Sequence, residues 1–279
     1  MTLQEKTTTV NGQTVHYWEA GAALPRALLL LHGGMGDAKL HWAPCMPLLA
    51  EEFRTIAPDL PGFGGSEALD TLSTENLLEW IKSFIDHLGL EQMALVGNDF
   101  GALLARLFAA AYPLYAPALV LVNGGSIPNI PPMLRTLART SLVGDALFYM
   151  LARSTLAPAQ LKRMIHAKEV LTDDFKTQVR ASVPAFAHMM RLWASDSIPE
   201  KRKPPLPTLL LWGAEDPIAP LAEAERIKNA IPGAVVSPIA DCGHMPQLEA
   251  SEVFAWQVTQ FLNDPGRTAK TELPGVGLL

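Results

Sequence analysis

Short apolar runs of strand length recur along the chain, and each ends at a polar or glycine-rich loop. In the first half these runs are Ala27–Leu31, Thr55–Ala57, Ala94–Val96 and Ala118–Val122. Runs that are apolar at every position are typical of a parallel sheet buried on both faces. Between them lie helical patterns, and the clearest, Thr74–Leu88, starts at a Ser73/Thr74 cap and keeps its apolar residues on one face. This alternation predicts an α/β fold with a doubly wound, mostly parallel sheet.

Both ends of the chain add expected elements to this sheet. At the start, Thr7–Val10 and Thr14–Glu19 are predicted to pair as a hairpin around Asn11-Gly12, a dipeptide typical of two-residue hairpin turns. Leu103–Tyr112 is predicted to be a further helix. Beyond residue 207 the expected elements are the strand Thr208–Trp212, the helix Leu221–Ile231, the strand Ala234–Pro238 and the helix Ser251–Leu262.

A proline-flanked segment interrupts the alternation. Pro128, Pro131 and Pro132 mark its start, and a second group of prolines marks its end, at positions 199, 204, 205 and 207. Residues 128–200 show helical patterns without strands, so we expect a helical cap inserted into the sheet domain. The predicted organisation is a core domain of residues 1–127 and 201–264, a cap of residues 128–200, and an extended tail of residues 265–279.

Composition excludes several classes of protein. The 279 residues are 49% hydrophobic and 18% charged, which excludes disorder for most of the chain. The net charge of −6, without a block of Lys and Arg, argues against a nucleic-acid or membrane-surface partner. Residues 128–200 have a formal charge of +3, whereas the remainder has −9. No apolar run is long enough to span a bilayer, and the first residues lack the pattern of a signal peptide, so we expect a cytoplasmic protein. Cys45 and Cys242 lack metal-ligand spacing, and neither a metal nor a cofactor is expected.

The stretch Gly97-Asn98-Asp99-Phe100-Gly101 lies between an expected buried strand and a helix. That is the setting of a nucleophile elbow, a strained turn that exposes its central side chain above the sheet. Glycines two positions before and after the centre are required where the two backbones approach too closely for a Cβ atom. The alternative is an ordinary Gly/Asn/Asp turn, which is frequent in α/β proteins. On the elbow interpretation the central residue is an aspartate, Asp99.

Two later residues favour the elbow interpretation. Asp216 follows the expected strand Thr208–Trp212, and His244 lies on the loop after the next strand. The chain order of nucleophile, acid and histidine is the one typical of this type of fold. Because catalytic groups gather beyond the carboxyl ends of parallel strands, we expect Asp99, Asp216 and His244 to meet there.

These motifs give the chain a resemblance to the α/β-hydrolase superfamily over nearly its whole length. His32-Gly33-Gly34-Met35-Gly36 resembles the oxyanion-hole loop of that superfamily, and residues 59–66 (DLPGFGGS) resemble the loop after its next strand. An aspartate in the elbow resembles the epoxide hydrolases, haloalkane dehalogenases and haloacetate dehalogenases. The resemblance implies that Asp99 is the nucleophile.

A carboxylate nucleophile limits the kinds of substrate that the protein can act on. A carboxylate that attacked an ester would give an anhydride, whereas attack on an sp³ carbon gives a stable alkyl ester. His244, made more basic by Asp216, is then expected to activate the water that hydrolyses this ester. Backbone N–H groups of Phe100 and of Gly34 or Gly33 are expected to stabilise the oxyanion.

The leaving group separates the candidate substrates. Dehalogenases of this type usually have a tryptophan, and haloacetate dehalogenases an arginine, directly after the nucleophile, where this chain has Phe100. Trp42 or Trp193 offers a replacement donor, although packing explains such residues equally well. Epoxide hydrolases supply an acid from the cap, usually as two tyrosines or as a tyrosine and a histidine. Tyr149 and His188 are the candidates here, with a purely structural role as the alternative for each.

The hypothesis is therefore a hydrolase that acts through an ester on Asp99, with epoxide hydrolysis to a diol as the first choice. A hydrolytic dehalogenase of haloalkanes or haloacids is the alternative. A non-hydrolytic protein of the same fold is a further alternative, either a lyase that uses Asp99 as a base or a ligand-binding receptor. The receptor ranks low because it would not need Asp216 and His244 together. The expected partners are a small, largely apolar organic substrate and water, with no nucleic acid and no membrane, and the oligomeric state stays open.

Overall fold

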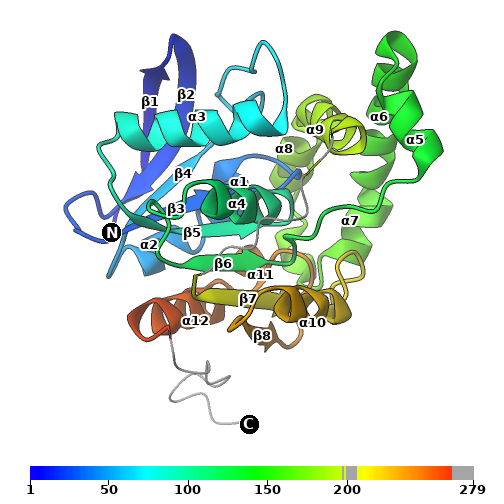
Figure 1. The fold of residues 1–279 in the computed structure, drawn as a ribbon. Coiled ribbons are helices and arrows are strands. Elements are labelled where there is room, and N and C mark those ends of the chain that lie inside the picture. Colours follow the sequence, from blue (N-terminus) through cyan, green and yellow to red (C-terminus); the bar gives the residue numbers. More distant parts are fainter. Residues whose placement is uncertain (197, 199–205, 266–279) are drawn as a thin grey trace.

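An eight-stranded sheet forms the centre of the protein. The computed structural model describes residues 1–196, 198 and 206–265. The strands are β1 (Gln4–Val10), β2 (Gln13–Ala20), β3 (Ala27–Leu31), β4 (Arg54–Pro58), β5 (Met93–Asn98), β6 (Leu119–Val122), β7 (Thr208–Gly213) and β8 (Val235–Ile239). Their order across the sheet is β1-β2-β4-β3-β5-β6-β7-β8 (Figure 1). The pairs β1–β2 and β2–β4 are antiparallel and all other pairs are parallel, which confirms the predicted α/β-hydrolase fold with a mostly parallel sheet.

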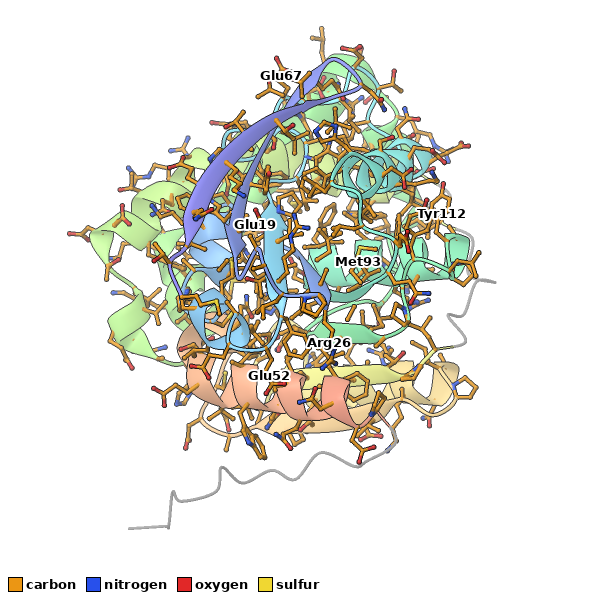
Figure 2. The ribbon with its side chains drawn as sticks, turned by 90° about the vertical axis from the view of Figure 1, so that its left-hand side faces the viewer. Glu19, Arg26, Glu52, Glu67, Met93 and Tyr112 are labelled. Atoms are coloured by element: carbon orange, nitrogen blue, oxygen red, sulfur yellow. The ribbon has the colours of Figure 1, made fainter. Side chains whose placement is uncertain are left out.

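The hairpin of β1 and β2 forms one edge of the sheet. It turns at Asn11-Gly12, as predicted, but β1 begins three residues earlier than the apolar pattern indicates, because Gln4 still pairs with Glu19. Figure 2 shows this side of the molecule, with β1 and β2 curving across the front and Glu19 near the end of β2. The Glu19 carboxylate is buried and accepts a hydrogen bond from Nε of Arg54 at 2.6 Å.

Helices cover both faces of the sheet, and alternate side chains of each strand point to opposite faces. Leu29 and Leu31 of β3 face the helices α3 (Thr74–His87), α4 (Phe100–Ala111) and α10 (Leu221–Ala230). Leu28 and Leu30 face the helices α1 (Ala38–Trp42), α2 (Met46–Leu49) and α12 (Ser251–Asn263). Burial on both faces is the reason that the strands are apolar at every position. The short helix α11 (Pro246–Glu249) precedes α12.

A helical insertion, defined here as residues 128–196, lies between β6 and β7. It contains α5 (Pro132–Ala138), α6 (Ser141–Thr155), α7 (Pro158–Met164), the 3-10 helix η1 (Lys168–Val170), α8 (Asp173–Ala181) and α9 (Val183–Ser195). Figure 1 shows these helices together in green and yellow-green at one side of the sheet domain. Within the described residues the insertion contains no strand. The predicted tail and the second proline group fall largely outside the described residues, so the predicted domain boundaries stay predictions.

Two features of the described residues bear on membranes and metals. Among residues 1–196, 198 and 206–265, no helix combines the length and apolar character needed to cross a bilayer. In the same part of the chain, no group of three or more His, Cys, Asp or Glu side chains is arranged to hold a metal ion.

Candidate active site

Asp99 occupies a strained turn between β5 and α4. Its backbone has φ 50° and ψ −109°, a conformation that L-residues rarely adopt. The two flanking glycines are required sterically: a Cβ on Gly97 would lie 2.2 Å from the Gly101 oxygen, and one on Gly101 would lie 2.1 Å from the Leu31 oxygen. The geometry is that of a nucleophile elbow and not of an ordinary turn. The Asp99 side chain is 36% exposed and lines a cavity.

His244 and Asp216 lie beside Asp99 at the carboxyl edge of the sheet. His244 Nδ1 is 2.7 Å from Asp216 Oδ2, and both side chains are almost fully buried. His244 Nε2 is 3.9 Å from Asp99 Oδ1, which is too long for a direct hydrogen bond. The structure thus brings all three predicted residues together, and it leaves Nε2 free of a hydrogen bond to Asp99.

The electrostatics of the three residues are coupled. Burial lowers the pKa of His244, but the charge and hydrogen bond of Asp216 and the charge of Asp99 outweigh it and raise that pKa to about 9. Burial alone would raise the pKa of Asp216, but the charge of His244 and the hydrogen bonds to this carboxylate hold the pKa below its usual value. Burial raises the pKa of Asp99 despite the opposing effect of His244 and of backbone N–H groups.

Two backbone N–H groups face the Asp99 carboxylate. Gly34 donates to Asp99 Oδ2 at 3.5 Å, and the N–H of Phe100 also acts on this carboxylate. The N–H of Gly33 points instead to Nδ1 of His41, at 3.5 Å. Of the two glycines left open by the sequence, the geometry therefore selects Gly34. These donors lie where an oxyanion on the Asp99 carboxyl group would form.

Asn123 is a site residue that was not predicted from the sequence. It follows β6, is fully buried and has φ 44°. Its side-chain nitrogen donates to Asp216 Oδ2 at 2.6 Å, and its oxygen accepts from the Gly213 N–H at 2.9 Å. Asn123 thereby fixes the carboxylate that orients His244. Its place directly after an apolar strand, at the same edge as the elbow, was the available signal.

A cavity of about 470 Å³ lies between this edge of the sheet and the helical insertion. Asp99, Phe100 and His244 line it from the sheet side, and Phe186 and Trp193 line it from α9. Phe186 and Trp193 are seven residues apart and therefore lie on the same face of the helix. The Trp193 ring meets the Phe100 ring edge-on, with 4.9 Å between centroids. Trp193 Nε1 is buried and has no hydrogen-bond partner among the described residues.

Comparison with known proteins now places the chain in a family. The model of the alpha/beta hydrolase family matches residues 28–257. The chain belongs to the α/β-hydrolase family. The family, the fold and the coarse class of hydrolase are thus confirmed, whereas the finer prediction of an aspartate-nucleophile branch stays a proposal.

Relatives within the α/β-hydrolase family differ in their chemistry. The chain is 28% identical over 270 residues to a 2-hydroxy-6-oxononadienedioate/2-hydroxy-6-oxononatrienedioate hydrolase of Pseudomonas putida, covering 89% of this chain and 91% of the relative. It is 27% identical over 271 residues to a 2-hydroxy-6-oxo-6-phenylhexa-2,4-dienoate hydrolase of Burkholderia cepacia, covering 89% and 91%. The haloalkane dehalogenase DbeA from Bradyrhizobium elkani USDA94 is similar in structure, with a TM-score of 0.76 over 95% of this chain and 99% of that one. Its 21% identity shows the shared fold alone.

Three residues predicted to line the pocket of this α/β-hydrolase lie elsewhere. Trp42 is fully buried on the other face of the sheet, where its ring lies 6.1 Å from that of Phe254. Its place in the core corrects the expectation that it lines the pocket. Tyr149 lies on α6 with 46% of its surface exposed and does not line the cavity of Asp99, because α6 turns this side chain outward.

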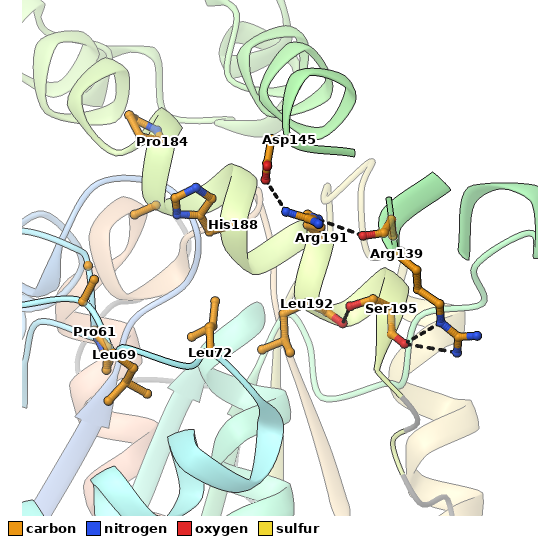
Figure 3. A pocket seen from close by; sticks show the side chains of 14 residues that line it. Pro61, Leu69, Leu72, Arg139, Asp145, Pro184, His188, Arg191, Leu192 and Ser195 are labelled. Carbon is orange, nitrogen blue, oxygen red and sulfur yellow. Dashed lines mark hydrogen bonds and ion pairs between the residues drawn. The ribbon is translucent and has the colours of Figure 1, made fainter. Parts of the chain in front are cut away.

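His188 also lies outside the catalytic cavity. It is exposed on α9 and lines a second cavity of about 640 Å³, between α9, the loop after β4 and the α5–α6 region. Figure 3 shows His188 on α9 above Pro61 and Leu69, with the ion pair of Arg191 and Asp145 to its right. The expectation that His188 donates to a substrate held at Asp99 is corrected by this placement on a different face of α9.

Proposed function

We propose that this α/β-hydrolase displaces a leaving group from a saturated carbon through a covalent ester on Asp99, and that the leaving group is a halide. The observation that carries the proposal is the elbow position of Asp99, beside a His244–Asp216 pair whose Nε2 is not hydrogen-bonded to the nucleophile. A serine nucleophile would hydrogen-bond directly to this nitrogen.

Together, the two steps hydrolyse a carbon–halogen bond. In the first, an oxygen of Asp99 forms a bond to the substrate carbon, while the carbon–halogen bond breaks and its electron pair leaves with the halide. In the second, His244 takes a proton from water, and the hydroxide attacks the carboxyl carbon of the Asp99 ester. The oxyanion that forms there is placed near the N–H groups of Gly34 and Phe100. Its collapse expels the alkoxide, which takes the proton from His244 and leaves as the alcohol, and the Asp99 carboxylic acid then loses its proton to solvent.

The residues that line the cavity favour a halide over an epoxide. A departing halide needs a hydrogen-bond donor, whereas the alkoxide of an opened epoxide needs a proton. Trp193 Nε1 is a buried donor without a described partner, but an indole N–H is far too weak an acid to protonate an alkoxide. Tyr149 and His188, the two proton donors expected for epoxide opening, both lie outside this cavity. The order of the two expectations is therefore reversed.

A second candidate is carbon–carbon bond hydrolysis of an oxo-dienoate. It is supported by the names of the Pseudomonas putida and Burkholderia cepacia relatives. It ranks below dehalogenation because attack of the Asp99 carboxylate on a substrate carbonyl would generate an anhydride.

The test is to trap the ester. The variant His244→Gln removes the base of the second step and leaves the first step intact. We expect a primary haloalkane to add an alkyl group to this variant, detected by intact-protein mass and located on Asp99 by peptide mass. An epoxide of the same carbon skeleton would add its whole mass instead, which distinguishes the two substrates.

The matched control is the double variant Asp99→Asn/His244→Gln, which should gain no mass. Wild-type turnover of a haloalkane without any adduct in His244→Gln would overturn the covalent mechanism. Turnover of an oxo-dienoate, read as the loss of its conjugated absorption, with no reaction of any haloalkane would transfer the proposal to carbon–carbon bond hydrolysis.

A further inference from the structure

Exposed apolar side chains gather on α5 and α6 of the helical insertion. We call this set the α5–α6 surface, and its members are Met133, Leu142, Val143, Tyr149 and Met150. Leu142 is 84% exposed and Met150 is 70% exposed. Elsewhere in the described residues, large exposed apolar side chains occur singly, at Met1, Leu114 and Ile218. A contiguous group of this kind marks a contact surface, whereas single residues do not.

The spacing of apolar residues along α6 places several of them on its outer face. Leu142, Ala146 and Met150 are spaced four residues apart and share one face, while Phe148 and Ala152 are buried against the rest of the insertion. A surface helix normally turns its polar face outward. Figure 1 shows α5 and α6 at the outer margin of the insertion, away from the sheet.

Positive charge lies beside the α5–α6 surface at Arg153, which is exposed on the outer face of α6. Arg135 and Arg139, on α5 and at its end, lie on the side of that helix opposite to Met133, and Arg139 lines the second cavity. Within the part of the chain that the structure describes, none of the three is paired with a carboxylate, and Arg135 and Arg139 donate to backbone carbonyls. Asp145, the acidic residue of α6, is paired with Arg191 of α9.

We propose that the α5–α6 surface binds the surface of a bilayer that contains anionic lipid. Apolar side chains beside exposed Arg153 match the acyl boundary and the headgroups of such a bilayer. The charge separation in the chain acts in the same direction, because residues 128–200 carry +3 and the remainder −9. An anionic surface therefore attracts the insertion and repels the sheet domain, which orients the protein. Two copies facing each other through this surface would bring two positively charged insertions together.

Binding at a membrane surface is compatible with the negative net charge of the chain and with the short helices of the described residues. The expectation of no membrane-surface partner rests on the whole-chain charge, which averages over two parts of opposite sign. Binding in the plane of the interface needs no spanning helix. The helix α6 ends at Thr155, and Thr155 and Leu156 line the catalytic cavity. An apolar substrate dissolved in the bilayer would thus meet the cavity at the end of the bound helix, a consequence that rests on the proposed function.

The test is flotation of the full chain with vesicles of phosphatidylcholine alone and of phosphatidylcholine with roughly one-third phosphatidylserine. We expect wild type to float with the anionic vesicles and to be released by high salt. The double variant Leu142→Ser/Met150→Ser should lower the partition coefficient about tenfold or more. Arg153→Gln should lower it about fivefold. The matched controls Leu114→Ser and Lys228→Gln change an equally exposed apolar residue and an exposed lysine outside the insertion, and should leave partition unchanged.

Several results would overturn the proposal. Equal partition of wild type onto neutral and anionic vesicles, or unchanged partition of the double variant with its circular dichroism intact, would each do so. A concentration-dependent dimer in sedimentation velocity that the double variant abolishes, without vesicle binding by wild type, would assign the surface to a second copy. Asp99→Asn should float like wild type, so a failure of ester trapping and a failure of membrane binding are told apart.

Discussion

The two sides of the catalytic cavity differ in how their polar groups are satisfied. On the sheet side, Asp216 holds hydrogen bonds to both Asn123 and His244. On the insertion side, the indole N–H of Trp193 is buried without a partner among the described residues. Buried groups that are mutually bonded are fixed before a substrate arrives, whereas an unpaired buried donor gains its partner from a ligand. On the proposed function, the sheet side carries out the chemistry and the insertion side recognises the leaving group.

The largest effect is expected from breaking the sheet side at Asp216. Asp216→Asn removes the charge that orients and raises the basicity of His244, and we expect the rate of ester hydrolysis to fall about 10³-fold. Alkylation of Asp99 does not need His244, so the ester should accumulate and be visible by mass. Rapid-quench kinetics with a haloalkane measures both steps. Asp70→Asn, which changes an exposed carboxylate in a loop, is the control. Equal loss of both steps would contradict the separation of roles.

A smaller effect is expected from the insertion side. Trp193→Phe keeps an aromatic ring on α9 and removes the unpaired N–H, so we expect alkylation by a haloalkane to slow about 30-fold. Hydrolysis of the ester, which comes after halide departure, should keep its rate. His188→Gln and Tyr149→Phe, which change residues outside the cavity, are the matched controls in the same insertion. If either control slowed alkylation as much as Trp193→Phe, the assignment of the leaving-group side would be wrong.

The same difference explains what the sequence could predict. The strands, the elbow and the three residues of the sheet edge follow from local signals, because apolar runs fix the strands and Gly97 and Gly101 report a close backbone approach. Residues at the carboxyl ends of parallel strands are then brought together by topology alone. Asn123 was not predicted, because asparagine is common in turns of every kind and tolerates a positive φ without any role in a site.

The sequence of the insertion does not show which helix faces line the cavity, because the rotation of each helix about its axis is set by the elements that pack against it. His188 and Trp193 are five residues apart on α9, which corresponds to a rotation of about 140°. One therefore lines the groove of Figure 3 and the other the catalytic cavity. The helix α6 has apolar residues on its outer as well as its inner face, so its sequence alone does not show which face is buried. That ambiguity explains the wrong placement of Tyr149 in the pocket wall.

The smallest effect is expected from a change of pH, which tests the role of His244 on the sheet side of the cavity. Burial lowers the pKa of His244, but Asp216 and Asp99 together raise it to about 9 in the free enzyme. Formation of the ester removes the charge of Asp99, so the pKa of His244 should be lower in the intermediate. Neutral His244 is the base, and the hydrolysis rate should therefore rise with pH, by about tenfold between pH 7 and pH 9. Single-turnover decay of the ester measures this profile.

In Asp216→Asn the residual rate should rise at a lower pH, because the carboxylate that raises the pKa of His244 is gone. A rate that is flat or falls over this range would show that His244 does not act as the base, and the sheet side would then lose the role assigned to it.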